Sequence, residues 1–161
     1  MRYTPQGPMG YFFEDAEIDD VHVTQSRTIT EADIVNFGGI IGDYNPLHFD
    51  AEYMSKSMFG QRIAHGMLTL SFATGLVNQL GANLKTVLAF KGLEIEFKAP
   101  VFIGDTIHVE MTTIEVRQSS KQPGGWVTQE VQVIKQDGTV VQAGKWSALI
   151  ASKTLMEQLQ G

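Results

Sequence analysis

The sequence contains no cysteine, and this absence excludes several kinds of chemistry before any motif is considered. Disulfides, thiolate nucleophiles, zinc ribbons and iron–sulfur clusters all require cysteine thiols. Histidine is scarce as well, since the 161 residues include only His22, His48, His65 and His108. Any acid–base chemistry that uses an imidazole must therefore draw on these four side chains.

Clusters of basic residues are also missing. The chain has 12 basic and 18 acidic residues, which gives a formal net charge of −6. The negative charge is concentrated in residues 1–61, which hold ten acidic and three basic residues. Without a basic patch we expect no binding to nucleic acid and none to an anionic membrane surface.

No apolar stretch at the N-terminus is long enough for a signal peptide. Residues 63–84 form a run of 22 without a formal charge, which is long enough to cross a bilayer. The run contains seven polar side chains and three glycines, a composition that favours a helix buried in a soluble protein. We therefore expect a cytoplasmic protein with no membrane partner.

The first half of the chain predicts mainly helices. After an irregular lead-in over residues 1–15, a loose alternation over 21–29 indicates a strand. Thr30 is a good N-cap for a following helix, which ends at the glycines up to Gly42. A second short helix is expected within 49–58, with Asp50 as its cap. The longest pattern runs over 67–80, where apolar residues on almost all sides predict burial on most sides.

The second half predicts an antiparallel sheet. The runs 87–101, 106–118, 126–135 and 140–151 are rich in Val, Ile, Phe and Thr, with stretches of period two. Turn-forming pairs separate them, and Asp137–Gly138 is the clearest hairpin signal. The fold class is therefore α+β, with a curved sheet wrapped around one long helix, in a single domain over 1–161.

The segment from Asp43 to His48 is the first candidate for chemistry. It places a carboxylate and an imidazole on either side of a turn stiffened by Pro46, and a turn can fold the two side chains toward each other. Such a pair can move protons to and from a water molecule, and the Asn45 amide could orient either group. The structural alternative is that Asp43 caps a helix end while His48 packs on the surface.

The second candidate is the backbone at Gly66, at the start of the long helix. Its N–H has no side chain to shield it and sits at the positive end of the helix dipole, where it suits a developing oxyanion. The structural alternative is a glycine required by tight helix–sheet packing, with His65 as a capping residue. No phosphate-binding glycine loop or serine-hydrolase elbow is present, and Asp43 with His48 gives too few ligands for a metal site. We expect neither a metal nor a cofactor.

These segments together resemble the MaoC-like family of hot-dog-fold proteins, and within it the (R)-specific enoyl-CoA hydratases. The resemblance rests on two motifs, Ile41-Gly-Asp-Tyr-Asn-Pro-Leu-His-Phe-Asp50 and Gly60-Gln-Arg-Ile-Ala-His-Gly-Met-Leu68. The later segment Phe97-Lys-Ala-Pro-Val-Phe-Ile-Gly-Asp105 is also similar to the family. The similarity extends over about residues 17–150.

The resemblance implies a hot-dog fold and a reversible hydration of trans-2-enoyl-CoA to (R)-3-hydroxyacyl-CoA. It assigns Asp43 and His48 as the catalytic pair and the Gly66 N–H as the oxyanion donor. Asn45 and His65 would support them, and Thr74 falls where such hydratases often have a serine. It also implies an acyl-CoA thioester as substrate and at least a homodimer.

Two other functions remain open on the same fold. One is an acyl-CoA thioesterase, because hot-dog folds host these enzymes as well, and the other is a non-catalytic module that binds acyl thioesters. The intact Asp43 and His48 pair favours the hydratase over both. The phosphates of CoA need basic partners, and Arg62 and Lys56 lie nearest in sequence, but nearness in sequence alone does not identify them as a site.

Overall fold

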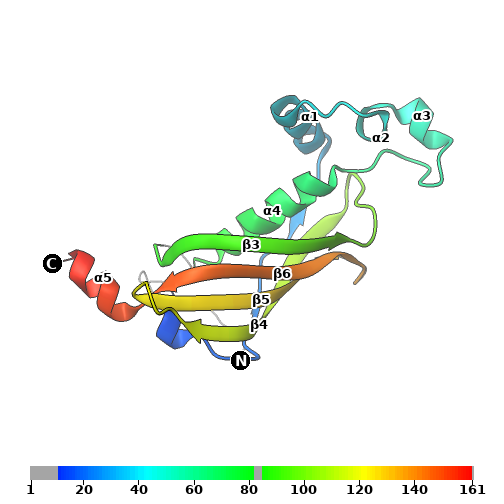
Figure 1. Cartoon of the computed structure of the whole chain (residues 1–161). Helices are drawn as coiled ribbons and strands as arrows, with labels where there is room; N and C mark the ends of the chain where they lie inside the picture. The colour runs from blue at the N-terminus through cyan, green and yellow to red at the C-terminus, as the bar shows by residue number, and fades with distance from the viewer. Residues whose placement is uncertain (1–10, 82–84, 161) are drawn as a thin grey trace.

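The computed structural model describes residues 11–81 and 85–160 (Figure 1). Most of the predicted lead-in, residues 1–10, lies outside the described part. The elements in chain order are η1 (Phe13–Asp15), β1 (Val21–Val23), β2 (Arg27–Thr28), α1 (Glu31–Ile41), α2 (Pro46–Phe49), α3 (Ala51–Ser55), α4 (Gly66–Gln79), β3 (Val87–Phe97), β4 (Thr106–Gln118), β5 (Gly124–Lys135), β6 (Val140–Ala151) and α5 (Lys153–Gln160).

The antiparallel sheet has the strand order β1-β4-β5-β6-β3, and β2 also pairs with β4. The long helix α4 lies against this sheet, and α1, α2 and α3 gather beyond its N-terminal end (Figure 1). Apolar side chains of α4 and of the sheet form one core, which includes Leu68, Leu76, Val109 and Val131. The predicted α+β class and hot-dog architecture are confirmed.

The strands of the second half closely follow the sequence pattern. Strands β4 and β6 have the predicted bounds, β5 begins two residues earlier than predicted, and β3 ends at Phe97 instead of 101. The hairpin between β5 and β6 turns at Asp137–Gly138, where Gly138 has a φ of +84° that favours glycine.

The first half departs from the prediction in two places. The strand expected over 21–29 is split into β1 and β2, because the Thr24 hydroxyl accepts a hydrogen bond from the Val109 N–H and interrupts the ladder. The helix expected within 49–58 is α3, with Asp50 as its cap as predicted. A separate helix, α2, begins at the turn that precedes α3. The Asn45 side chain caps α2 by accepting a hydrogen bond from the Leu47 N–H, and Pro46 occupies the first helical position.

Leu68, Leu70, Leu76 and Val77 of α4 are buried, as the apolar pattern predicted, but one side of the helix is exposed. Met67, Ser71, Thr74 and Asn78 form an exposed stripe along the helix, three or four residues apart. The reason is that the sheet covers α4 from one side only, while α1 to α3 reach only its N-terminal end. No helix in the described part of the chain is long and apolar enough to cross a membrane.

Candidate active site

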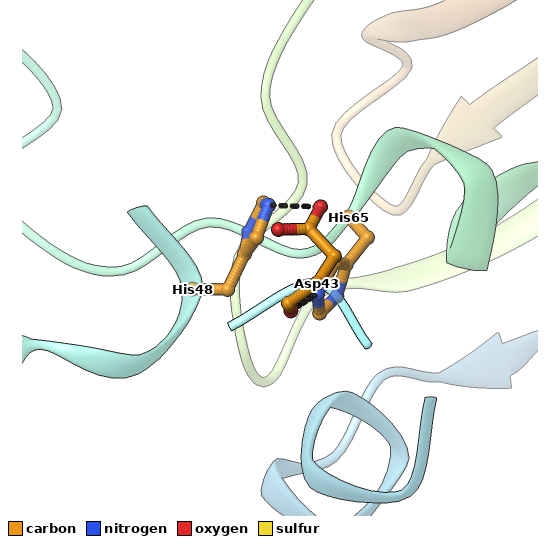
Figure 2. Close-up of side chains that lie close together, drawn as sticks. All are labelled: Asp43, His48 and His65. Carbon is orange, nitrogen blue, oxygen red and sulfur yellow. Dashed lines mark hydrogen bonds and ion pairs between the residues drawn. The ribbon is translucent and has the colours of Figure 1, made fainter. Parts of the chain in front are cut away.

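The turn between α1 and α2 brings Asp43 and His48 together. Helix α1 ends at Gly42, whose φ of +77° reverses the chain, and the His48 N–H donates to the Asn45 carbonyl as α2 begins. The His48 Nε2 atom lies 3.8 Å from an Asp43 carboxylate oxygen (Figure 2). His48 is buried, whereas the Asp43 carboxylate is about half exposed, so the pair is open to solvent on the side of the carboxylate.

The other nitrogen of His48 fixes the protonation pattern of the ring. Nδ1 lies 2.7 Å from the Ile63 carbonyl oxygen, and since a carbonyl only accepts, Nδ1 must carry a hydrogen. In the neutral ring, Nε2 then has a free lone pair on the side of Asp43. Burial lowers the pKa of His48, the nearby His65 adds to this effect, and the Ile63 carbonyl and the Asp43 carboxylate oppose it.

Asn45 holds the carboxylate of Asp43 in place. Its backbone N–H donates to one Asp43 carboxylate oxygen at 3.1 Å, and its own side-chain oxygen accepts from the Leu47 N–H at 3.0 Å. One oxygen of Asp43 is thus bound within the turn, while the other faces His48. The Asp43 carboxylate is thus oriented by the Asn45 backbone, whereas the Asn45 side chain caps α2.

His65 lies beneath the pair and contacts both of its members. Its Nε2 is 3.0 Å from the Asp43 backbone oxygen, and its ring stacks on His48 with centroids 3.7 Å apart (Figure 2). The rings of Phe37 and Phe49 meet it edge-on. His65 precedes α4 at the N-cap position but makes no side-chain capping bond there, so its contacts are with the pair rather than with the helix.

One ligand atom each from Asp43, His48 and His65 lies within 4.8 Å of the others, a spacing that could also suit a metal ion. The two rings are nearly parallel, with 29° between their planes, so their in-plane lone pairs do not converge on one point. One nitrogen of each ring is also bonded to a backbone carbonyl. The arrangement therefore favours proton chemistry over the binding of an ion.

Gly66 is the first residue of α4, so its N–H belongs to the first turn, where backbone donors have no acceptor within the helix. The Phe97 ring packs on this glycine, and a Cβ there would lie 2.7 Å from a ring carbon. A larger residue here would have to displace the Phe97 ring, which fits the structural interpretation and does not conflict with the oxyanion role. Gly66 also borders a cavity of about 560 Å³.

Thr74 is not brought to the pair. It lies eight residues beyond Gly66 on α4, about 12 Å along the helix axis. Its hydroxyl donates to the Ser71 carbonyl at 2.7 Å. Thr74 borders a second cavity of about 530 Å³, between the exposed stripe of α4 and the sheet, where no lysine, arginine, aspartate or glutamate is found among the described lining residues.

The two basic residues nearest to the motifs are both engaged in ion pairs. Both terminal nitrogens of Arg62 donate to the Glu31 carboxylate, which raises the pKa of Arg62, and Lys56 lies 2.7 Å from Glu52. Arg62 therefore connects the segment before α4 to the start of α1.

One residue of the site was not predicted. The Gln142 side chain, from β6, donates from Nε2 to the Gly66 carbonyl at 2.7 Å, across 76 positions of sequence. It is buried, with 2% of its surface exposed. The only hint in the sequence is a polar residue beside Val141 in a mostly apolar strand, which does not identify its partner.

Comparison with known proteins shows the family to which the chain belongs. A family model described as a MaoC like domain matches residues 14–135. The protein MaoC of Klebsiella aerogenes is 38% identical over 126 residues, which cover 74% of this chain but 37% of that protein. An (R)-specific enoyl-CoA hydratase of Rhodospirillum rubrum is 37% identical over 103 residues, or 63% of this chain and 69% of that enzyme.

The fold is shared with a solved hydratase. The unliganded R-hydratase PhaJ1 of Pseudomonas aeruginosa superposes with a TM-score of 0.76 at 26% identity, over 89% of this chain and 88% of that one. The chain belongs to the MaoC-like family, whose members among these relatives include hydratases and dehydratases.

Proposed function

We propose that this chain catalyses the reversible hydration of trans-2-enoyl-CoA to (R)-3-hydroxyacyl-CoA. The proposal rests mainly on the lone pair of His48 Nε2, which lies beside the Asp43 carboxylate. The names of the relatives support the same reaction class, since the Rhodospirillum rubrum protein is an (R)-specific enoyl-CoA hydratase.

The pair suits one water molecule. With His48 neutral and Asp43 ionised, both facing atoms are hydrogen-bond acceptors, so they repel each other unless a donor lies between them. A water can donate one hydrogen to each, which turns its oxygen lone pair toward C3 of the substrate. The hydroxyl adds at C3, the pair takes up the remaining proton, and a proton returns to C2 from the same side.

The other residues support this step. The Gly66 N–H stabilises the negative charge that develops on the thioester oxygen. Asn45 fixes the carboxylate, and His65 holds both the Asp43 backbone and the His48 ring. The acyl chain extends along the exposed stripe of α4 toward Thr74, into a cavity whose described lining carries no charged side chain. Addition of water is not a redox step, so the reaction needs no cofactor.

The test is a spectroscopic assay of the purified chain with crotonyl-CoA. Loss of the enoyl absorbance, with the (R)-3-hydroxy product identified by chiral analysis, is the expected result. Release of free CoA thiol while the enoyl absorbance persists would instead select the thioesterase. Binding of acyl-CoA by calorimetry, with no turnover on a panel of enoyl-CoAs, would select the binding module.

A further inference from the structure

Two side chains hold Gly66 against the sheet, and they come from residues that lie opposite each other on neighbouring strands. Phe97 on β3 and Gln142 on β6 are direct register partners. Phe97 packs on the α-carbon of Gly66, and Gln142 donates a hydrogen bond to its carbonyl. The position of the first residue of α4 is thus set by a pair of neighbouring strand residues.

The hydrogen bonding of Gln142 is incomplete. Its Nε2 bonds to Gly66, but its Oε1 is buried and has no partner among the described residues. An unpaired buried acceptor destabilises the folded state, so an apolar side chain of similar length would be expected if only stability mattered here.

The orientation of the amide is nevertheless fixed. If the amide were rotated by 180°, its oxygen would face the Gly66 carbonyl, which is also an acceptor. On the other side of Gly66, the carbonyl of His65 accepts from the Thr69 N–H at 3.2 Å. The peptide that carries the Gly66 N–H is therefore held within the helix by Thr69, and Gln142 holds the next peptide, which shares the Gly66 α-carbon, against the sheet.

We infer that Gln142 is a positioning residue that sets the location of the Gly66 N–H, the oxyanion donor of the proposed hydration. This inference rests on the proposed function for its catalytic consequence. A donor displaced by about 1 Å from a developing charge can lose about 100-fold in rate, whereas substrate binding in the ground state depends on it much less.

The experiment compares Gln142→Met with Thr86→Val. Methionine keeps the length of the side chain but cannot donate. Thr86 also has a buried hydroxyl with no partner among the described residues, and it lies by Ala151 at the far end of β6, so it serves as a matched control. In Gln142→Met we expect kcat for crotonyl-CoA to fall about 10- to 100-fold with KM within about 2-fold, and Thr86→Val to keep kcat.

A second measurement does not depend on turnover. The amide resonance of Gly66 in a ¹H–¹⁵N spectrum of the free protein should shift in Gln142→Met and stay in place in Thr86→Val. An unshifted Gly66 resonance, or an unchanged kcat in a folded Gln142→Met, would overturn the inference. If the wild-type chain itself fails to hydrate crotonyl-CoA, the proposed function fails, and the Gly66 resonance still decides whether Gln142 positions the backbone at Gly66.

Discussion

At the scale of single residues, the decisive feature is which nitrogen of His48 carries its hydrogen. The Ile63 carbonyl binds Nδ1, and Nε2 is left as an acceptor toward Asp43. The sequence predicts that Asp43 and His48 meet across a turn, but not this tautomer. The partner of Nδ1 is a backbone carbonyl 15 positions away, and backbone carbonyls are the same for every residue type.

The lowered pKa of His48 predicts a specific pH dependence. The unprotonated ring accepts the proton in hydration, so activity is retained above the His48 pKa and lost as the pH falls through it. Because burial lowers this pKa, the acid limb of kcat/KM should have its midpoint below the ordinary imidazole value of about 6.5.

A pH profile of crotonyl-CoA hydration measures this midpoint. His108→Gln is a suitable control, because His108 lies on β4 beside Glu110 and outside the pair. The control should keep the same acid limb. A midpoint clearly above 6.5 in the wild-type chain would contradict the assignment of His48 as a buried neutral base.

At the scale of elements, the packing of α1 against α2 positions the catalytic turn. Gly38 in α1 faces the Phe49 ring of α2, and Phe49 in turn meets His65 edge-on. Sequence patterns predicted α1 and its cap at Thr30 because these signals are local. They did not predict α2, whose four residues are too few to show a helical period.

This packing predicts different effects at two adjacent glycines. A Cβ at Gly38 would lie 2.5 Å from the Phe49 ring, so Gly38→Ala must displace the ring and should cost about 1–3 kcal/mol of stability and lower kcat. A Cβ at Gly39 would make only an ordinary contact of 3.7 Å with the Tyr44 hydroxyl. Gly39→Ala should therefore gain about 0.5–1 kcal/mol through helix propensity.

Denaturant unfolding of both variants, with crotonyl-CoA assays alongside, measures these effects. Equal stability of the two alanine variants would show that the contact between Gly38 and Phe49 does not set the position of the turn.

At the scale of the whole molecule, the strand β3 lies at one edge of the sheet, and almost all of its residues are at least partly exposed. Large apolar residues among them include Phe90, Leu93 and Phe97. An exposed apolar edge strand readily pairs with another chain, which agrees with the homodimer expected from the family resemblance. Light scattering should therefore give at least twice the 17.8 kDa mass of one chain, and a monomeric mass would contradict this prediction.

The sequence predicts more of the fold than of the site. Alternation in the second half and the hairpin at Asp137–Gly138 are local patterns, so the sheet and the long helix could be predicted. The contacts of Gln142 with Gly66 and of His65 with Asp43 depend on how distant elements pack, and no spacing along the chain encodes them. The exposed stripe of α4 could not be predicted either, because burial depends on which side the sheet covers.

In the proposed reaction, Asp43 and His48 act as one unit on a shared water. The most direct test is crotonyl-CoA hydration by Asp43→Asn, His48→Gln and the double variant, with folding verified by circular dichroism. Each single variant should lose about 10²–10⁴ in kcat, and the double variant should lose little more than either, since groups that act together are not additive. Near-wild-type hydration by either single variant would contradict a catalytic role for the pair.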